Sequence, residues 1–201
     1  MPRPRRAGQS RGRPGCSGGS GGRSRGPPAH RRLNTARPVR RGTSTPCTGG
    51  FPIWFNGVTG RDITDDHVDA TSRFLAAGDG LVQMPLATDT DAWSKDARQQ
   101  YQILSTSTDA DGTPIAVTEL QGPDYSRIRS SDFNFVAAYA NYYVCNGAVI
   151  SAQFGDTRAD AGAKAALQRL FPGRTVEQLD TDSLGAGGGG IHCVTQQQPR
   201  P

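Results

Sequence analysis

The fold is decided by residues 133–180, which read FNFVAAYANYYVCNGAVISAQFGDTRADAGAKAALQRLFPGRTVEQLD. Two apolar runs flank Asn146-Gly147, a dipeptide typical of the tight turn between antiparallel strands. The Ala-rich stretch that follows is amphipathic, and Asp156 or Thr157 at its start predicts a capped helix. The closing RTVEQLD has the composition of one more strand. The segment therefore predicts a ββαβ module: a hairpin, a helix and a returning strand.

Residues 51–120 can be interpreted as a weaker copy of that module. FPIWF at 51–55 is a short apolar run bounded by Pro and Gly, which predicts a strand. GDGLVQMPL and TPIAVTEL predict two more strands, and DTDAWSKDARQQYQILSTS between them predicts a helix capped by Asp91 or Thr90. Helices that separate short groups of strands indicate an α/β fold, with α+β as the alternative. The apolar face expected for this helix consists of Trp93, Ala97, Tyr101 and Leu104.

The N-terminal segment, residues 1–50, is rich in Arg, Gly, Pro and Ser and has few large apolar side chains. Such a composition cannot bury enough surface to offset the entropy of ordering, so we expect disorder. One interpretation is an RG-type tail that binds nucleic acid through phosphate contacts. The other is that the segment is not an authentic protein sequence, since Arg, Gly and Pro in excess without Lys or acid resemble a GC-rich reading frame translated out of register.

The formal net charge of +5 is a property of the N-terminus alone. Residues 1–60 hold twelve arginines and no acid, whereas residues 61–201 hold eleven basic and eighteen acidic residues. No basic surface is therefore expected beyond the N-terminus, and nucleic acid is an improbable partner for the main domain. No apolar run is long enough for a membrane span, and four scattered cysteines without a CxxC spacing favour reduced thiols in the cytoplasm.

Two stretches carry residues that are capable of chemistry. His67 and Asp69 flank one valine, so both side chains lie on one face if the stretch is extended, and the pair then forms an acid/base with a charge partner. A solvated acidic turn is the alternative interpretation of this stretch. Cys193 follows four glycines that permit close approach of a ligand to the backbone, and N–H groups in such a loop stabilise negative charge. The spacing of the His and Cys residues does not match a zinc site.

Three segments together resemble the agmatine deiminase and bacterial peptidylarginine deiminase family of guanidine-modifying enzymes. GGGGIHCVTQQQP at 187–199 is similar to the C-terminal signature of that family. DITDDHVDATSRF at 62–74 is similar to its His-x-Asp segment, and YANYYVCNGAVISAQFGD at 139–156 to its Asn-containing hairpin. The segments occur in the order found in the family and together cover roughly residues 51–199.

The resemblance implies an α/β-propeller built from ββαβ modules, of which residues 51–201 would be a C-terminal part. It implies a hydrolase that needs no cofactor and no metal and acts on a small guanidine, agmatine or an arginine side chain. In that family's chemistry Cys193 is the nucleophile, His67 the general acid/base and Asp69 a carboxylate that binds the guanidinium.

The resemblance also implies that the chain is incomplete, because family members are much longer and contribute further acids to the site from an upstream half. We therefore expect a C-terminal fragment from a truncated or frameshifted gene, with poor activity by itself. Two alternatives remain open: a peptidylarginine deiminase, and an RG-tail nucleic-acid-binding protein with a non-catalytic domain. Oligomeric state is not predicted by any of these patterns.

Overall fold

The computed structural model describes residues 52–58, 60, 67–132 and 134–198, so the disorder expected for residues 1–50 lies outside the described part. None of the helices within the described part is long and apolar enough to cross a bilayer. The elements in chain order are η1 (Val68–Ala70), β1 (Ser72–Ala76), β2 (Asp79–Met84), α1 (Ala92–Ser105), β3 (Ala116–Gln121), β4 (Tyr143–Cys145), β5 (Ala148–Gln153), α2 (Thr157–Leu170), β6 (Thr175–Asp180), α3 (Asp182–Ala186) and η2 (His192–Val194).

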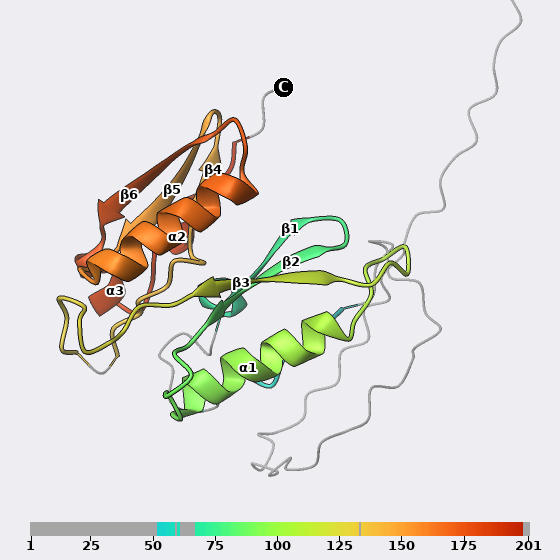
Figure 1. Cartoon of the computed structure of the whole chain (residues 1–201), viewed down its shortest axis with the longest axis horizontal. Helices are drawn as coiled ribbons and strands as arrows, with labels where there is room; N and C mark the ends of the chain where they lie inside the picture. The colour runs from blue at the N-terminus through green and yellow to red at the C-terminus, as the bar shows by residue number, and fades with distance from the viewer. Residues whose placement is uncertain (1–51, 59, 61–66, 133, 199–201) are drawn as a thin grey trace, which may run out of the picture. The chain divides into compact units, whose positions relative to one another are not determined.

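The strands form two three-stranded sheets of the same topology (Figure 1). In the first sheet β1 pairs antiparallel with β2, and β2 pairs parallel with β3. In the second sheet β4, β5 and β6 repeat this arrangement. Helix α1 connects β2 to β3 and α2 connects β5 to β6, so each half is a ββαβ module. The module predicted for 133–180 is confirmed, and a copy of it lies earlier in the chain, although it begins at β1 and not at residue 51.

Local signals place the ends of these elements. The turn between β4 and β5 contains Gly147 at φ 78°, a backbone conformation that favours glycine. The Asp156 carboxylate caps α2 by accepting a hydrogen bond from the Ala159 N–H at 3.2 Å. The Asp91 carboxylate caps α1 in the same way, with Ser94 N–H as the donor at 3.0 Å. Of the two caps considered for each helix, the aspartate is the one used.

The apolar face expected for α1 is only partly the buried face. Ala97 and Leu104 are buried, whereas Trp93 and Tyr101 are half-buried. Gln100, which the apolar pattern left out, is buried because its side chain accepts a hydrogen bond from a serine hydroxyl of β1 and donates one to a neighbouring aspartate. A pattern that counts only apolar residues does not predict the burial of a polar side chain whose hydrogen bonds are satisfied by other side chains.

The strand expected at 51–55 is wrong for its described residues, which adopt no regular structure. Ile53 and Phe55 pack against a cluster beneath α1, while Trp54 between them is 75% exposed. The alternation is that of a strand, but no strand lies beside it to supply backbone hydrogen bonds among the described residues.

Strand β1 and helix α3 were not predicted from the sequence. Strand β1 reads SRFLA, and its Phe74 is 62% exposed, so the apolar pattern is weak. Its strand conformation depends on pairing with β2, from which two residues separate it. Helix α3 has only five residues, fewer than an apolar period needs to become visible.

The two modules share one core. Leu120 of β3 is 1% exposed and lies in a cluster with Phe154 and Ala163 of the second module. The Arg73 guanidinium of β1 also donates a hydrogen bond to the Tyr142 carbonyl at 2.9 Å. The second module therefore covers the buried face of the first sheet. This packing positions the two turns that carry the site, one from each module, relative to each other.

The repeat places one residue type in two different surroundings. Leu120 is the fifth residue of β3 and pairs with Gln83, and Leu179 is the fifth residue of β6 and pairs with Ala152. Leu120 is 1% exposed, but Leu179 is 50% exposed. Leu120 lies in the cluster that includes Ala163 of α2, which accounts for the difference.

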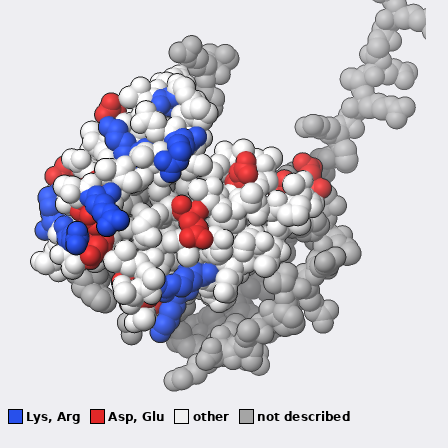
Figure 2. Space-filling model, in the orientation of Figure 1, with Lys and Arg blue, Asp and Glu red and all other residues white. Residues whose placement is uncertain are grey.

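Charged side chains of both signs are interspersed on the face seen in Figure 2. This agrees with the expectation that the strongly basic character belongs to the N-terminus. The described residues establish an α/β fold of two modules; the complete propeller stays a prediction.

Candidate active site

The three residues expected to carry chemistry come from two turns far apart in the chain. His67 immediately precedes η1, and Asp69 lies within it. Cys193 lies in η2, after the glycine run that ends at Gly190. The extended conformation considered for the His67–Asp69 stretch is wrong, because the chain forms a 3-10 turn there.

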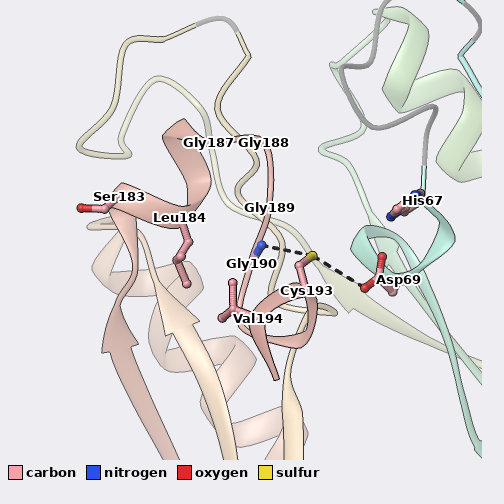
Figure 3. Close-up of a pocket in the computed structure, with 10 residues that line it drawn as sticks. All are labelled: His67, Asp69, Ser183, Leu184, Gly187, Gly188, Gly189, Gly190, Cys193 and Val194. Atoms are coloured by element: carbon pink, nitrogen blue, oxygen red, sulfur yellow. Dashed lines mark hydrogen bonds between the residues drawn. The ribbon is translucent and has the colours of Figure 1, made fainter. Parts of the chain in front are cut away.

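The two turns line one pocket of about 380 Å³ (Figure 3). His67, Asp69 and Cys193 all contribute to its wall, so the structure brings the three predicted residues together. Figure 3 shows Cys193 between the glycine run and Asp69, with His67 beside Asp69. The other lining residues are Ser183, Leu184, Gly187, Gly188, Gly189, Gly190 and Val194.

The Cys193 sulfur is exposed and is surrounded by polar atoms. The Gly190 N–H and the Asn141 side-chain amide each point a donor at Sγ from 3.4 Å. Sγ also lies 3.8 Å from Oδ2 of Asp69. Donors aimed at sulfur stabilise the negative charge of a thiolate, which is the reactive form of cysteine. Cys145, the other free thiol in the described part of the chain, faces the Ala148 carbonyl oxygen instead.

The two oxygens of the Asp69 carboxylate have different surroundings. Oδ2 lies 2.5 Å from Nδ1 of His192. Oδ1 is buried and has no hydrogen-bond partner among the described residues. A buried carboxylate oxygen without a donor costs free energy, on the order of 1–3 kcal/mol or more.

Asn141 was not assigned a role from the sequence, although it holds the site together. It is 2% exposed. Its amide nitrogen donates to the Asp69 carbonyl at 3.3 Å as well as to Sγ, and its Oδ1 accepts from the His192 N–H at 2.8 Å. The signal that the sequence offered was an asparagine within an apolar run, because a buried amide needs partners.

Gly190 is required by this arrangement for a steric reason. A Cβ at this position would lie 2.4 Å from Oδ1 and 2.8 Å from Cγ of Asn141. The glycine therefore lets the loop approach Asn141 closely enough to donate its N–H to the sulfur. Among the described residues, no group of three His, Cys, Asp or Glu side chains is placed to hold a metal ion.

The fold is that of deiminases of known structure. The chain superimposes on the agmatine deiminase of Enterococcus faecalis with a TM-score of 0.60 and 30% identity, covering 68% of this chain and 41% of that one. Residues 52–199 match the family described as Porphyromonas-type peptidyl-arginine deiminase, and the chain belongs to that family.

Individual relatives agree with this assignment. The chain is 40% identical over 151 residues to a candidate agmatine deiminase of Streptomyces coelicolor, covering 75% of this chain and 43% of the relative. It is 33% identical over 167 residues to the agmatine deiminase of Medicago truncatula, covering 73% of this chain and 44% of the relative. The chain thus spans less than half the length of these relatives.

Proposed function

We propose that the pocket belongs to an agmatine deiminase-type hydrolase, which converts agmatine and water into N-carbamoylputrescine and ammonia. The observation that carries the proposal is the convergence of Cys193 Sγ and the half-satisfied Asp69 carboxylate, 3.8 Å apart, in a pocket that His67 also lines. A carboxylate beside a nucleophile suits a guanidinium, which is a planar cation with several N–H donors. Relatives named as agmatine deiminases support the same reading.

In the first half-reaction the Asp69 carboxylate, whose Oδ2 lies 3.8 Å from Sγ, accepts an N–H of the guanidinium and orients its carbon toward the sulfur. The Cys193 thiolate forms a bond to that carbon. His67 donates a proton to the leaving nitrogen, the C–N bond breaks with its electron pair going to nitrogen, and ammonia departs. A covalent thiouronium remains on Cys193.

In the second half-reaction His67 accepts a proton from water, and the oxygen bonds to the same carbon. The C–S bond then breaks, which returns the thiolate to the donors of Gly190 and Asn141. The urea-type product leaves with its charge reduced relative to the guanidinium. No redox step occurs, and water is the only co-reactant.

We expect turnover by this chain to be slow. Asp69 is the only carboxylate among the described residues that line the pocket. A cation held by one carboxylate lacks further charge-assisted hydrogen bonds of ~1.5–3 kcal/mol each, and loose positioning costs about 100-fold in rate.

Two structural and cellular expectations accompany this proposal. Residues 51–201 would form part of an α/β-propeller, with the two described modules as consecutive repeats. The protein would work in the cytoplasm with its thiols reduced.

A second candidate is a peptidylarginine deiminase, because the matching family is described by that activity. It uses the same sulfur, histidine and carboxylate, and it differs in what holds the far end of the substrate. The two candidates are therefore separated by substrate and not by mechanism.

The test is to incubate the purified chain with agmatine or with benzoyl-arginine amide and to quantify ammonia and the urea-type product. We expect equal amounts of both products from agmatine, none with Cys193→Ala, and unchanged formation with the matched control Cys145→Ala. Product from benzoyl-arginine amide alone would select the second candidate. Absence of any Cys193-dependent product from either substrate would refute the proposed function for this chain.

A further inference from the structure

His192 contacts the site without lining its pocket. The residue directly precedes the nucleophile in the chain, and its side chain is 35% exposed. Its Nδ1 lies 2.5 Å from Oδ2 of Asp69, yet the pocket wall is built from other residues. We assign the hydrogen of this contact to Nδ1, since carboxylate oxygens act as acceptors.

The backbone of His192 is fixed as firmly as its ring. Its N–H donates to Oδ1 of Asn141 at 2.8 Å and is also 3.2 Å from the Asn141 carbonyl oxygen. Asn141 in turn donates to the Asp69 carbonyl oxygen. His192 is thus held through its backbone by Asn141, which also contacts the sulfur, and through its ring by the Asp69 carboxylate.

The two oxygens of the Asp69 carboxylate differ in their contacts. Oδ2 is occupied by His192, while Oδ1 is buried and without a partner among the described residues. A carboxylate that could rotate freely about its χ2 bond would exchange these two oxygens. The bond to Nδ1 stops that exchange and keeps Oδ2 beside the sulfur, 3.8 Å from Cys193 Sγ.

We propose that His192 is a positioning residue for guanidinium binding: its Nδ1–H holds Oδ2 of Asp69 at 3.8 Å from Cys193 Sγ, so that the carboxylate keeps its charge beside the sulfur, where the substrate cation binds. The inference rests on the proposed function and deepens it. The imidazole itself does not contact the substrate. It orients the carboxylate that does, and it couples that orientation to the turn that carries the sulfur.

The test uses a covalent probe, so it does not depend on turnover. Chloroacetamidine carries an amidinium, which a carboxylate attracts, and chloroacetamide is its neutral analogue. Both alkylate a thiolate by the same step, in which the S–C bond forms while the C–Cl bond breaks and chloride leaves. The rate at Cys193 is followed by mass spectrometry on the tryptic peptide 175–201, in which Cys193 is the only cysteine. The ratio of the amidine rate to the amide rate measures guidance by Asp69.

We expect the unaltered chain to favour the amidine. His192→Phe keeps a planar ring without a donor and should lower the ratio about tenfold, as expected for the loss of one oriented charge-assisted contact. His192→Asn, whose amide nitrogen lies near the place of Nδ1, should restore most of the ratio. The rate with neutral chloroacetamide should change little in either variant.

The outcomes separate this inference from the proposed function. A ratio that stays high in His192→Phe, or amide and amidine rates that fall together, would overturn the positioning role and leave the guanidinium site intact. A ratio near one in the unaltered chain would overturn the guanidinium site and this inference with it. Nitrogen-15 NMR of the imidazole in the unaltered chain provides a check without a disruptive variant, since an unprotonated Nδ1 of His192 would also overturn the role.

Discussion

Leu120 and Leu179 occupy corresponding positions of the two modules, so truncating each to alanine tests whether the modules pack as the structure shows. Leu120→Ala removes a side chain that is 1% exposed and lies in the shared core. Leu179→Ala makes the same chemical change at the corresponding position of β6, where the side chain is 50% exposed. Each variant is therefore the control for the other.

The magnitudes follow from burial. Removing a fully buried leucine costs about 2–5 kcal/mol, because burial is lost and a cavity remains. A half-exposed leucine gains only about half of the ~1.5–3 kcal/mol of full burial, part of which the alanine retains, and its truncation leaves no enclosed cavity. We expect a cost of about 1 kcal/mol or less for Leu179→Ala. The two free energies of unfolding should differ by at least ~1–2 kcal/mol.

Urea unfolding followed by circular dichroism and by tryptophan fluorescence gives both values. With a slope of about 2 kcal/mol per molar urea, the difference corresponds to a shift of roughly 0.5–1 M in the midpoint. Equal destabilisation by the two variants would refute the reasoning, since it would mean that Leu179 in β6 is as well covered as Leu120 in β3. A small effect of Leu120→Ala would show instead that α2 does not pack on the first sheet.

Two further predictions concern the site loop and the core. Gly190→Ala should destabilise the chain by about 1–3 kcal/mol, because its Cβ would lie 2.4 Å from Asn141 Oδ1; Gly187→Ala, whose Cβ would meet no atom closer than 3.4 Å, is the matched control for the same urea titration. Burial, together with the hydrogen bond to Asp160, raises the pKa of Tyr139, so its protonated form is favoured in the folded state. The resulting stability is present below pH about 10 and is lost as the pH rises further, since the unfolded chain then ionises first. Tyr139→Phe should therefore flatten the decline of unfolding free energy above that pH, and an unchanged slope would contradict the assignment.

Much of the site could be named from the sequence because its residues carry local signals. Cys193 follows a glycine run, and His67 and Asp69 are two residues apart, so all three could be singled out as candidates without a fold, and the family resemblance then predicted their roles. His192 and Asn141 could not be given roles from the sequence, because their roles are contacts with distant parts of the chain. His192 contacts Asp69, which lies 123 residues away, and Asn141, which lies 51 residues away. A polar side chain acquires such a role only when the fold supplies its partner.

The elements divide in the same way. The hairpin at Asn146-Gly147 and the starts of both long helices depend on backbone conformations and hydrogen bonds within a few residues, so they could be predicted from the sequence, although the choice of the aspartate as the cap could not. Strand β1 exists through its partner β2, and 52–55 lacks such a partner among the described residues, so it was the pairing of strands in the fold that made β1 and not 52–55 a strand. Leu120 and Leu179 are both leucines at the fifth position of their strands, but only Leu120 is buried. The difference comes from packing between the modules, which joins residues far apart in the chain and is therefore not visible in the local sequence.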